Sequence, residues 1–287
     1  MQVSTIGVVG AGQMGGGIAQ IAAAAGINVV VHDAFPVAIS KCKAVHRKSL
    51  GKFVEKGKMT QGDMDAALAR IRFTESLDGL TGADWLIEAI VEDAAVKKDL
   101  FARLAAMFPA ESVVLATNTS SIGITQIAAA AGAAAPRVVG MHFFNPVPLM
   151  ALVEVIPALQ TSKDVVERTM ALATRLGKTP LKANDRAGFV SNRVLMPMIN
   201  EAFYAWMEGV AEPEAIDGIM KLGCNFPMGP LRLADFIGLD TCAHIMNVLA
   251  EGLNSERYRP CPLLRQLVAA GRLGDKTGRG VFEYPPR

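Results

Sequence analysis

Cysteine is scarce in this sequence, and its spacing argues against two kinds of site. Four cysteines occur among 287 residues, at positions 42, 224, 242 and 261, with no C-x-x-C pair. A disulfide framework or a zinc site would need paired spacings. We therefore expect reduced thiols, no metal site and a cytoplasmic location.

The sequence also lacks a strong charge of one sign and any long apolar run. The formal net charge is +2 and no long basic run occurs, which argues against nucleic acid as a partner. No apolar run approaches the roughly 20 residues of a membrane helix, so we expect no membrane span. The glycine motif described next starts close to the first residue, and we expect no signal or transit peptide before it.

The first thirty-three residues follow a strand, turn, helix, strand pattern that ends in an acid. An apolar run over 6–9 leads into Gly10, Gly12 and Gly15, spaced G-x-G-x-x-G, and a second apolar run leads into Asp33. This order is typical of the βαβ unit that binds a dinucleotide. Because the flanking strands, helix and acid all agree, we predict nucleotide binding rather than a turn that serves packing alone.

Each residue type in this motif has a physical reason. Gly10 permits the tight turn, Gly12 leaves room for the pyrophosphate, and Gly15 lets helix and strand pack closely. The helix N-terminus then faces the phosphates with unpaired N–H groups. A carboxylate at Asp33 accepts hydrogen bonds from ribose hydroxyls and repels a 2′-phosphate, and no arginine adjoins it. We therefore predict NAD rather than NADP.

Strands and helices continue to alternate up to about residue 185. Helical stretches over 36–53 and 63–71 predict a helical hairpin inserted in the domain. Strands are then expected over 85–90, 113–117 and 138–143, and helices over 94–107 and 122–131. This alternation predicts an α/β fold, a Rossmann-type and mostly parallel sheet over 1–185, with ligands bound beyond the carboxyl ends of the strands.

The pattern changes in the last third of the chain. Strand-like runs stop, and helical stretches follow over 188–208, 213–222, 231–253 and 263–271. We predict an all-helical C-terminal domain over 186–287. Its large apolar surface favours a homodimer through this domain, although one buried helix within it would explain the same pattern.

One histidine and one glutamate have the spacing of a general-base pair. His142 ends an apolar run, two prolines force a turn, and a second apolar run carries Glu154 in its middle. A lone Glu in an apolar strand is costly unless it is paired, and the turn brings it back towards His142. The residue types alone leave both a catalytic and a purely structural pair open.

Two other polar residues have alternative interpretations. Asn192 falls on the apolar face of the helix predicted over 188–208, where a buried amide needs partners. A side chain bonded within the core explains it as well as a functional one. Ser121 precedes a predicted helix, and it is either a functional hydroxyl or the N-cap of that helix.

Several motifs together resemble one enzyme family. They keep their order over nearly the whole chain: Gly10-Ala11-Gly12-Gln13-Met14-Gly15, Asn118-Thr-Ser-Ser121, His142-Phe-Phe-Asn-Pro146, Leu152-Val-Glu-Val155, Gly188-Phe-Val-Ser-Asn-Arg193, Pro227-Met-Gly-Pro230 and Gly238-Leu-Asp240. The chain resembles the short 3-hydroxyacyl-CoA dehydrogenases, among them the 3-hydroxybutyryl-CoA dehydrogenases. The resemblance implies a reversible, NAD-dependent oxidation of an L-3-hydroxyacyl-CoA to the 3-ketoacyl-CoA.

The resemblance also implies roles for individual residues. His142 is expected to be the acid/base and Glu154 to orient it, while Ser121 and Asn192 hydrogen-bond the reacting oxygen of the substrate. The expected cofactor contacts are Gly10, Ala11, Gly12, Gln13, Met14, Gly15, Asp33, Glu92, Lys97, Asn145 and Lys276. Ser49 and Lys56 match positions that meet the CoA, which fits the basic helical hairpin.

Two positions depart from the family pattern, and two other functions stay open. Ala151 stands where relatives often have lysine, and Asp93 where they usually have asparagine; both bear on the affinity for cofactor and acyl-CoA. One alternative is a dehydrogenase of a free hydroxy acid or sugar acid on the same scaffold. The other is a non-catalytic NAD-binding homologue, against which the four polar motif residues argue together.

Overall fold

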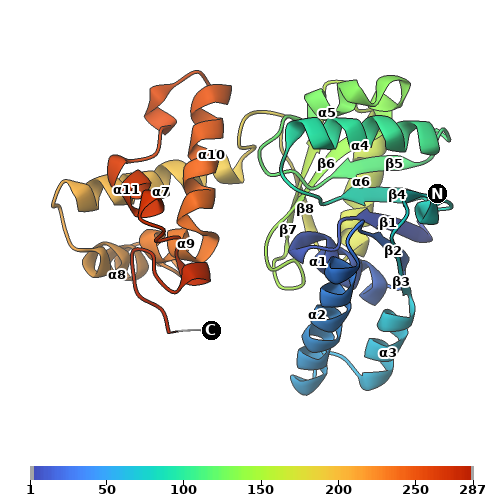
Figure 1. The fold of residues 1–287 in the computed structure, drawn as a ribbon, viewed down its shortest axis with the longest axis horizontal. Coiled ribbons are helices and arrows are strands. Elements are labelled where there is room, and N and C mark those ends of the chain that lie inside the picture. Colours follow the sequence, from blue (N-terminus) through green and yellow to red (C-terminus); the bar gives the residue numbers. More distant parts are fainter. Residues whose placement is uncertain (1–2, 286–287) are drawn as a thin grey trace. The chain divides into compact units, whose positions relative to one another are not determined.

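The computed structural model describes residues 3–285 and divides the chain into two compact units. One unit ends at Asp185 and the other begins at Arg186. The first is an α/β unit and the second is built of helices (Figure 1).

The α/β unit is organised on an eight-stranded sheet with the order β3-β2-β1-β4-β5-β6-β7-β8. Strands β1 to β6 are parallel, whereas β7 is antiparallel to β6 and parallel to β8. This confirms the predicted mostly parallel sheet. The strands are β1 (Thr5–Val9), β2 (Asn28–His32), β3 (Ile71–Thr74), β4 (Trp85–Glu88), β5 (Val114–Thr117), β6 (Val138–Phe143), β7 (Leu152–Pro157) and β8 (Thr179–Lys182).

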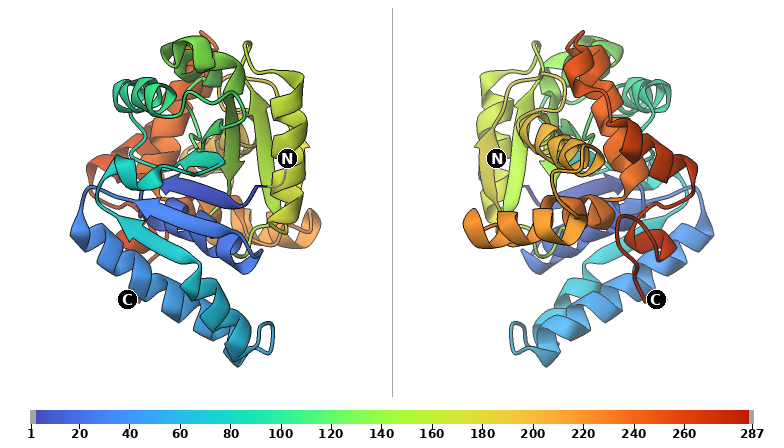
Figure 2. Two further views of the ribbon diagram at one scale, coloured as in Figure 1. Left: turned by 90° about the vertical axis from the view of Figure 1, so that its right-hand side faces the viewer. Right: turned by 90° about the vertical axis from the view of Figure 1, so that its left-hand side faces the viewer.

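Helices lie on both faces of this sheet (Figure 2). Buried side chains of α1 and α6 share one apolar cluster with strand residues such as Val8 and Val139, while α4 and α5 contact each other. Cover on both faces explains why the central strands are continuous apolar runs. The helices are α1 (Gln13–Ala24), α2 (Pro36–Glu55), α3 (Gln61–Ala69), α4 (Ala94–Met107), α5 (Ile124–Ala130) and α6 (Lys163–Arg175).

The predicted helical hairpin is confirmed as α2 and α3, which lie between β2 and β3 in the chain and contact each other. Pro36 starts α2, where its fixed φ suits a first helical residue. Thr60 and Asp63 form a capping box at the start of α3. These local signals hold the hairpin ends in place.

The elements of this unit differ from the prediction in several places. Ile71 was expected to end a helix, but it begins the short edge strand β3, because the run 71–74 pairs in register with β2. The helix expected between the glycine motif and the second strand begins inside the motif, at Gln13. The elements α6 and β8 were not predicted.

The second unit contains the helices α7 (Ser191–Met207), α8 (Pro213–Gly223), α9 (Pro230–Ile237), α10 (Leu239–Gly252) and α11 (Pro262–Ala269). The single helix expected over 231–253 is wrong. Gly238, with φ of +104°, separates α9 from α10, and the two helices bend by 97°. Apolar periodicity continues through Gly238, so the pattern hid the break.

Within residues 3–285, no single helix has the length and apolar composition to cross a membrane; the bent pair α9 and α10 reaches them only when taken together.

Candidate active site

The glycine loop between β1 and α1 has little room where packing is needed and open space where a ligand would lie. Gly10 has φ of +108°, and a Cβ there would lie 2.5 Å from the Ala89 carbonyl oxygen. A Cβ on Gly15 would lie 1.9 Å from the Gly10 carbonyl oxygen, whereas one on Gly12 would meet no atom within 4 Å. Each glycine therefore has the surroundings that its predicted role requires. The first turn of α1 has no side-chain cap, which leaves its N–H groups for an anion.

Asp33 lies at the carboxyl end of β2 beside this loop. Its Oδ2 accepts a hydrogen bond from the Ala11 N–H at 2.8 Å, and its Oδ1 accepts one from the Phe35 N–H at 2.9 Å. A carboxylate has about four lone-pair sites, so acceptor capacity remains for ribose hydroxyls. The same contacts fix the glycine loop against β2.

A cavity of about 870 Å³ opens over Gly10, Gly12 and Asp33. His32 lines it, and its buried Nδ1 has no hydrogen-bond partner among residues 3–285. Burial lowers the pKa of His32 below 6.5, partly offset by a backbone hydrogen bond at Thr74, so the ring is neutral at pH 7. An unpartnered polar atom in this cavity fits a ligand with its own donors and acceptors.

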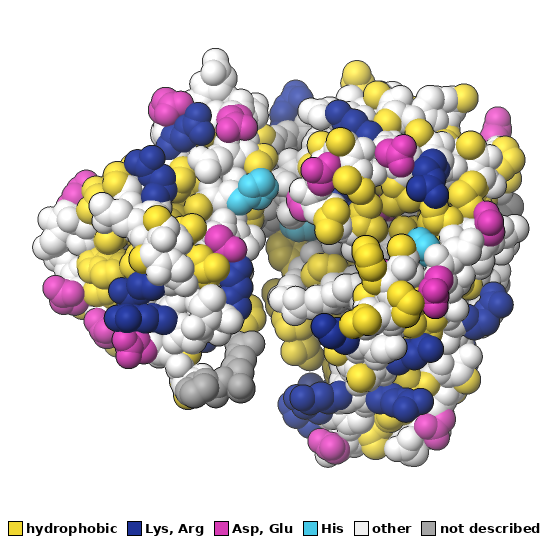
Figure 3. All heavy atoms as spheres, viewed as in Figure 1, with side chains coloured by type: hydrophobic (Ala, Val, Ile, Leu, Met, Phe, Trp, Pro, Cys, Tyr) yellow, Lys and Arg dark blue, Asp and Glu magenta, His cyan; other side chains and the backbone are white. Residues whose placement is uncertain are grey.

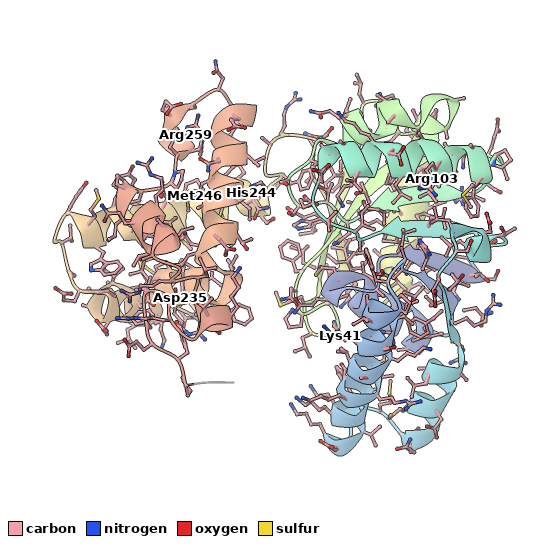
Figure 4. All side chains as sticks on the ribbon, in the orientation of Figure 1. Lys41, Arg103, Asp235, His244, Met246 and Arg259 are labelled. Atoms are coloured by element: carbon pink, nitrogen blue, oxygen red, sulfur yellow. The ribbon has the colours of Figure 1, made fainter. Side chains whose placement is uncertain are left out.

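The cavity also includes an arginine that is distant in sequence. Arg103 of α4, which is labelled in Figure 4, lines it together with Asp33 and the exposed Phe35. The sequence neighbours of Asp33 include no arginine, but the fold brings one from α4. The open space at Gly12, the uncapped helix and the acid at β2 together fit a dinucleotide.

His142 and Glu154 form the pair that the turn was expected to allow. They lie directly opposite each other in the antiparallel register of β6 and β7. His142 Nδ1 and Glu154 Oε2 are 2.8 Å apart, and both residues are buried. An ionised carboxylate only accepts, so Nδ1 carries the proton of the neutral ring and Nε2 is its acceptor. The Phe144 ring lies 4.7 Å from the imidazole, between centroids.

The loop after β5 donates several hydrogen bonds to one carboxylate, that of Glu92. Glu92 Oε1 accepts hydrogen bonds from the Ser121 hydroxyl at 2.8 Å and from the Thr119 hydroxyl at 2.6 Å. The N–H groups of Ser120 and Ser121 donate to the same oxygen at 2.9 and 3.0 Å. Ser121 does not cap the next helix, since α5 begins at Ile124 with Gly123 at its N-cap.

Lys97, expected as a cofactor contact, is buried inside the unit. It is 1% exposed, and its ammonium pairs with Glu88 and lies 3.4 Å from Glu92 Oε2. Val96 and Leu100 of the same helix line the 870 Å³ cavity instead. The structure thus brings Glu92, Lys97 and Ser121 together in one network.

A second cavity of about 430 Å³ lies between α2 and the turn after β6. Ser49, Lys56 and Asn145 all line it, so the structure brings these three predicted residues together. Three more lysines line the same wall: Lys48, Lys52 and Lys58. Figure 3 shows basic side chains gathered over α2, at the lower right. Such a wall suits an anionic ligand such as a phosphate.

Asn192 and Lys276 belong to the helical unit. Asn192 is 8% exposed on α7, which confirms its predicted place on the buried side of that helix. Lys276 lies in a short 3₁₀ helix (Asp275–Thr277), and its Nζ is 2.6 Å from Asp240 Oδ1. Lys276 is therefore held by a partner in the helical unit.

Two residues that shape these sites had no role assigned from the sequence, although Asn118 belongs to a quoted motif. Asn118 Oδ1 accepts a hydrogen bond from the Phe143 N–H at 2.8 Å, next to His142. Lys178 Nζ donates to the carbonyls of Val147 and Met150, which holds the turn between β6 and β7. No local pattern marks Lys178, because its partners are distant in sequence.

The two residues that depart from the family pattern, Asp93 and Ala151, have local structural roles that other residue types can also fill. Asp93 is the N-cap of α4 and accepts a hydrogen bond from the Val96 N–H at 2.9 Å, a role that Asn also fills. Ala151 is exposed, and its carbonyl pairs with the Thr179 N–H at 2.8 Å.

Comparison with known families agrees with the geometry of both units. Residues 5–186 match the model of the 3-hydroxyacyl-CoA dehydrogenase NAD binding domain, and residues 188–284 match the model of the 3-hydroxyacyl-CoA dehydrogenase C-terminal domain. Together the two matches account for nearly the whole chain.

Similar proteins carry related names. The chain is 57% identical over 278 residues to a probable 3-hydroxybutyryl-CoA dehydrogenase of Deinococcus radiodurans, covering 97% of this chain and 99% of that one. A probable 3-hydroxybutyryl-CoA dehydrogenase of Bacillus subtilis is 53% identical, covering 99% and 98%. The crystal structure of (S)-3-hydroxybutyryl-CoA dehydrogenase from Ralstonia eutropha superposes with a TM-score of 0.94 at 48% identity, covering 99% and 100%. The chain therefore belongs to the 3-hydroxyacyl-CoA dehydrogenase family and is an NAD-dependent enzyme.

Proposed function

We propose that this enzyme interconverts L-3-hydroxybutyryl-CoA and acetoacetyl-CoA, with His142 as the acid/base. The observation that carries the proposal is the buried His142–Glu154 pair, 2.8 Å between Nδ1 and Oε2, at the carboxyl end of a parallel strand. The names of the similar dehydrogenases support the four-carbon substrate.

In oxidation, His142 Nε2 takes the proton of the substrate hydroxyl. The charged ring is then stabilised by Glu154, which also keeps the neutral ring in the tautomer that can accept. In reduction, the same ring returns the proton to the ketone oxygen. Bound NAD supplies the hydride acceptor. Protein groups that align the reacting atoms and move the proton contribute the rest of the rate.

Ser121 and Asn192 are proposed to hydrogen-bond the reacting oxygen, where negative charge develops. Support for Ser121 comes from its fixed place in the loop after β5, where Glu92 holds both its N–H and its hydroxyl. Support for Asn192 comes from its burial as an amide near the start of α7. A buried amide keeps a position only when partners hold it.

The cofactor would be held by the glycine loop and by Asp33. The N–H groups at the start of α1 suit the pyrophosphate, and the Asp33 carboxylate suits the ribose hydroxyls. Of the other expected contacts, Glu92 supports the loop after β5 by hydrogen bonds and Lys97 pairs with Glu92. Asn145 and Lys276 are proposed as cofactor contacts from the family resemblance.

The CoA moiety would lie in the 430 Å³ cavity beside α2. Ser49 lines this cavity together with Lys56 and three further lysines, and the CoA phosphates carry the complementary charge. The exposed lysines also draw an anionic substrate towards the site over a distance of about a Debye length.

We also propose that the helical unit forms a homodimer. On α8, Ile219 is 63% and Leu222 is 90% exposed, three residues apart on one helix face. A second copy of this chain would cover them. Light scattering on the wild type should give more than the single-chain mass of 30.4 kDa, and Leu222→Asp should lower it; a monomeric wild type would end this proposal.

The function is tested by NADH oxidation with acetoacetyl-CoA, run beside free acetoacetate and beside NADPH. Fast turnover that needs both the CoA moiety and NADH supports the proposal. Equal turnover of free acetoacetate would favour a dehydrogenase of free hydroxy acids. NADH binding without turnover of either compound would favour a non-catalytic homologue.

A further inference from the structure

Glu88 is a buried carboxylate at the carboxyl end of β4 with no assigned role. It is 1% exposed, and each of its oxygens is engaged. Oε1 accepts a hydrogen bond from the Ile90 N–H at 2.8 Å and pairs with the Lys97 ammonium. Oε2 accepts one from the Thr117 hydroxyl at 2.6 Å. Three neighbouring segments, the turn after β4, β5 and α4, therefore hold this side chain in one position.

Lys97 connects Glu88 to a second carboxylate. Its ammonium is buried between Glu88 and Glu92, 3.4 Å from Oε2 of Glu92. A buried ammonium costs several kcal/mol unless anions surround it, so Lys97 must stay near both carboxylates. Glu88 is the more deeply buried partner, since the Glu92 side chain is 29% exposed. Glu88 thus sets where the ammonium lies.

Glu92 in turn holds the loop after β5 by accepting its hydrogen bonds. Its other oxygen, Oε1, accepts from the hydroxyls of Thr119 and Ser121 and from two consecutive N–H groups. Burial would raise the pKa of Glu92, but the Lys97 charge and these hydrogen bonds lower it below the ordinary value, so Glu92 is ionised at neutral pH. One anion therefore fixes both the backbone and the side chain of Ser121.

We propose that Glu88 is a positioning residue for Ser121, acting through Lys97 and Glu92. The proposal rests on the role proposed above for Ser121 at the reacting oxygen. Of the two carboxylates paired with the ammonium among residues 3–285, a neutral side chain at position 88 leaves Glu92 alone. Lys97 and Glu92 then draw together, and Glu92 moves away from Ser121.

The test is a double-mutant cycle on kcat for acetoacetyl-CoA reduction, with Glu88→Gln, Ser121→Ala and the double variant. Glutamine keeps the shape of Glu88 and removes its charge. We expect Glu88→Gln to lower kcat about tenfold in the wild-type background. In the Ser121→Ala background it should lower kcat less than about twofold. Equal losses in both backgrounds, or no loss in either, would overturn the proposal, since a merely structural role acts regardless of Ser121.

A crystal structure of Glu88→Gln tests the positioning of Ser121 independently of the catalytic role proposed for its hydroxyl. We expect the Ser121 Oγ to Glu92 distance to exceed the 2.8 Å of the wild type, with the His142–Glu154 pair unchanged. An undisturbed Glu92 and Ser121 would overturn the positioning proposal. A displaced Ser121 combined with full activity of Ser121→Ala would overturn only the role proposed for that hydroxyl.

A matched control lies at the other end of the same strand. Asp84 precedes β4, and its carboxylate accepts from the Ser4 N–H, the Ser4 hydroxyl and the Thr5 N–H at 2.8, 2.6 and 2.9 Å. Asp84→Asn should leave kcat unchanged; a tenfold loss would show that any disturbed carboxylate beside β4 lowers activity, and would overturn the proposal.

A second variant covers the case in which Glu88→Gln does not fold. Thr117→Val removes one hydrogen bond to Glu88 and keeps the ion pair. It should lower kcat by a smaller factor than Glu88→Gln, and only when Ser121 is present. NADH titration checks that the folded variants bind cofactor. A Thr117→Val loss of the same size in the Ser121→Ala background would overturn the proposal.

Discussion

The two units bury polar side chains for different purposes. In the helical unit, buried acids satisfy backbone groups of another segment: Asp217 accepts from the N–H groups of Leu231 and Arg232, both at 2.8 Å. Asp235, labelled in Figure 4, accepts from those of Val281 and Phe282 at 2.8 and 2.9 Å. These acids connect segments of the chain.

In the α/β unit, two pairs of buried titratable side chains meet each other at the carboxyl ends of strands, while the buried Lys178 and Arg137 donate to backbone carbonyls. His142 faces Glu154, and Glu88 faces Lys97. Pairs of buried side-chain charges cost desolvation that an apolar pair would avoid, so they are weak devices for stability. The helical unit therefore uses its buried acids to hold chain segments together, and the α/β unit uses its two buried pairs to place reactive groups.

The largest effect should follow from His142→Gln. We expect kcat for acetoacetyl-CoA reduction to fall about 10² to 10⁴-fold, because the general acid is lost. Affinity for NADH, measured by fluorescence titration, should stay close to the wild type, since the glycine loop and Asp33 are untouched. Retained turnover would remove His142 from the mechanism and make its pair with Glu154 structural.

A smaller loss should follow from Glu154→Gln. The amide keeps a partner for the ring but no longer fixes its tautomer or stabilises its charge. We expect kcat to fall about 10- to 100-fold, with KM changed less. A loss confined to thermal stability would show that this pair, like the acids of the helical unit, serves only to hold the fold together.

Lys56→Met tests the exposed lysines that line the 430 Å³ cavity. Removing one exposed charge from the lysine wall should raise KM for acetoacetyl-CoA about two- to fivefold, with kcat unchanged, since exposed charge pairs are weak. Lys163→Met, an exposed lysine at the start of α6, is the matched control and should leave KM as it is. Equal changes in both would indicate general electrostatic attraction rather than a CoA site.

The smallest effect on turnover should follow from Asp235→Asn. Asn loses the charge that accepts from two N–H groups and from the Tyr284 hydroxyl at 2.6 Å. We expect a loss of about 1–3 kcal/mol in the free energy of unfolding, measured with urea, and unchanged kcat of the folded enzyme. A large fall in kcat at full stability would show that the helical unit also uses its buried acids for catalysis.

Local pattern was enough for the parts of the fold whose signals are strong. The glycine spacing, the acid at Asp33 and the helix over 94–107 were all readable, since each depends on residues near in sequence. The His142–Glu154 pair was readable too, because two prolines force the turn that sets the register of β6 and β7. Edge strand β3 was hidden because it follows α3 after one residue, and because Arg72 and Thr74 leave it without a continuous apolar run.

Networks that join distant segments could not be read in the same way. Ser121 and Glu92 come from loops after different strands, and nothing in either loop shows that five donors from one loop point to one carboxylate oxygen. The burial of Lys97 likewise depends on both Glu88 and Glu92. Such contacts arise from the order of strands in the sheet, which brings β4 beside β5.

The pH profile of kcat/KM for acetoacetyl-CoA reduction, in the wild type and in Glu154→Gln, tests the central claim most directly. In reduction the ring gives up a proton, and its partner at 2.8 Å is the Glu154 carboxylate. We expect the profile of the variant to differ in shape from that of the wild type, because the ring then faces a neutral amide. Superimposed profiles would contradict a His142–Glu154 acid/base pair.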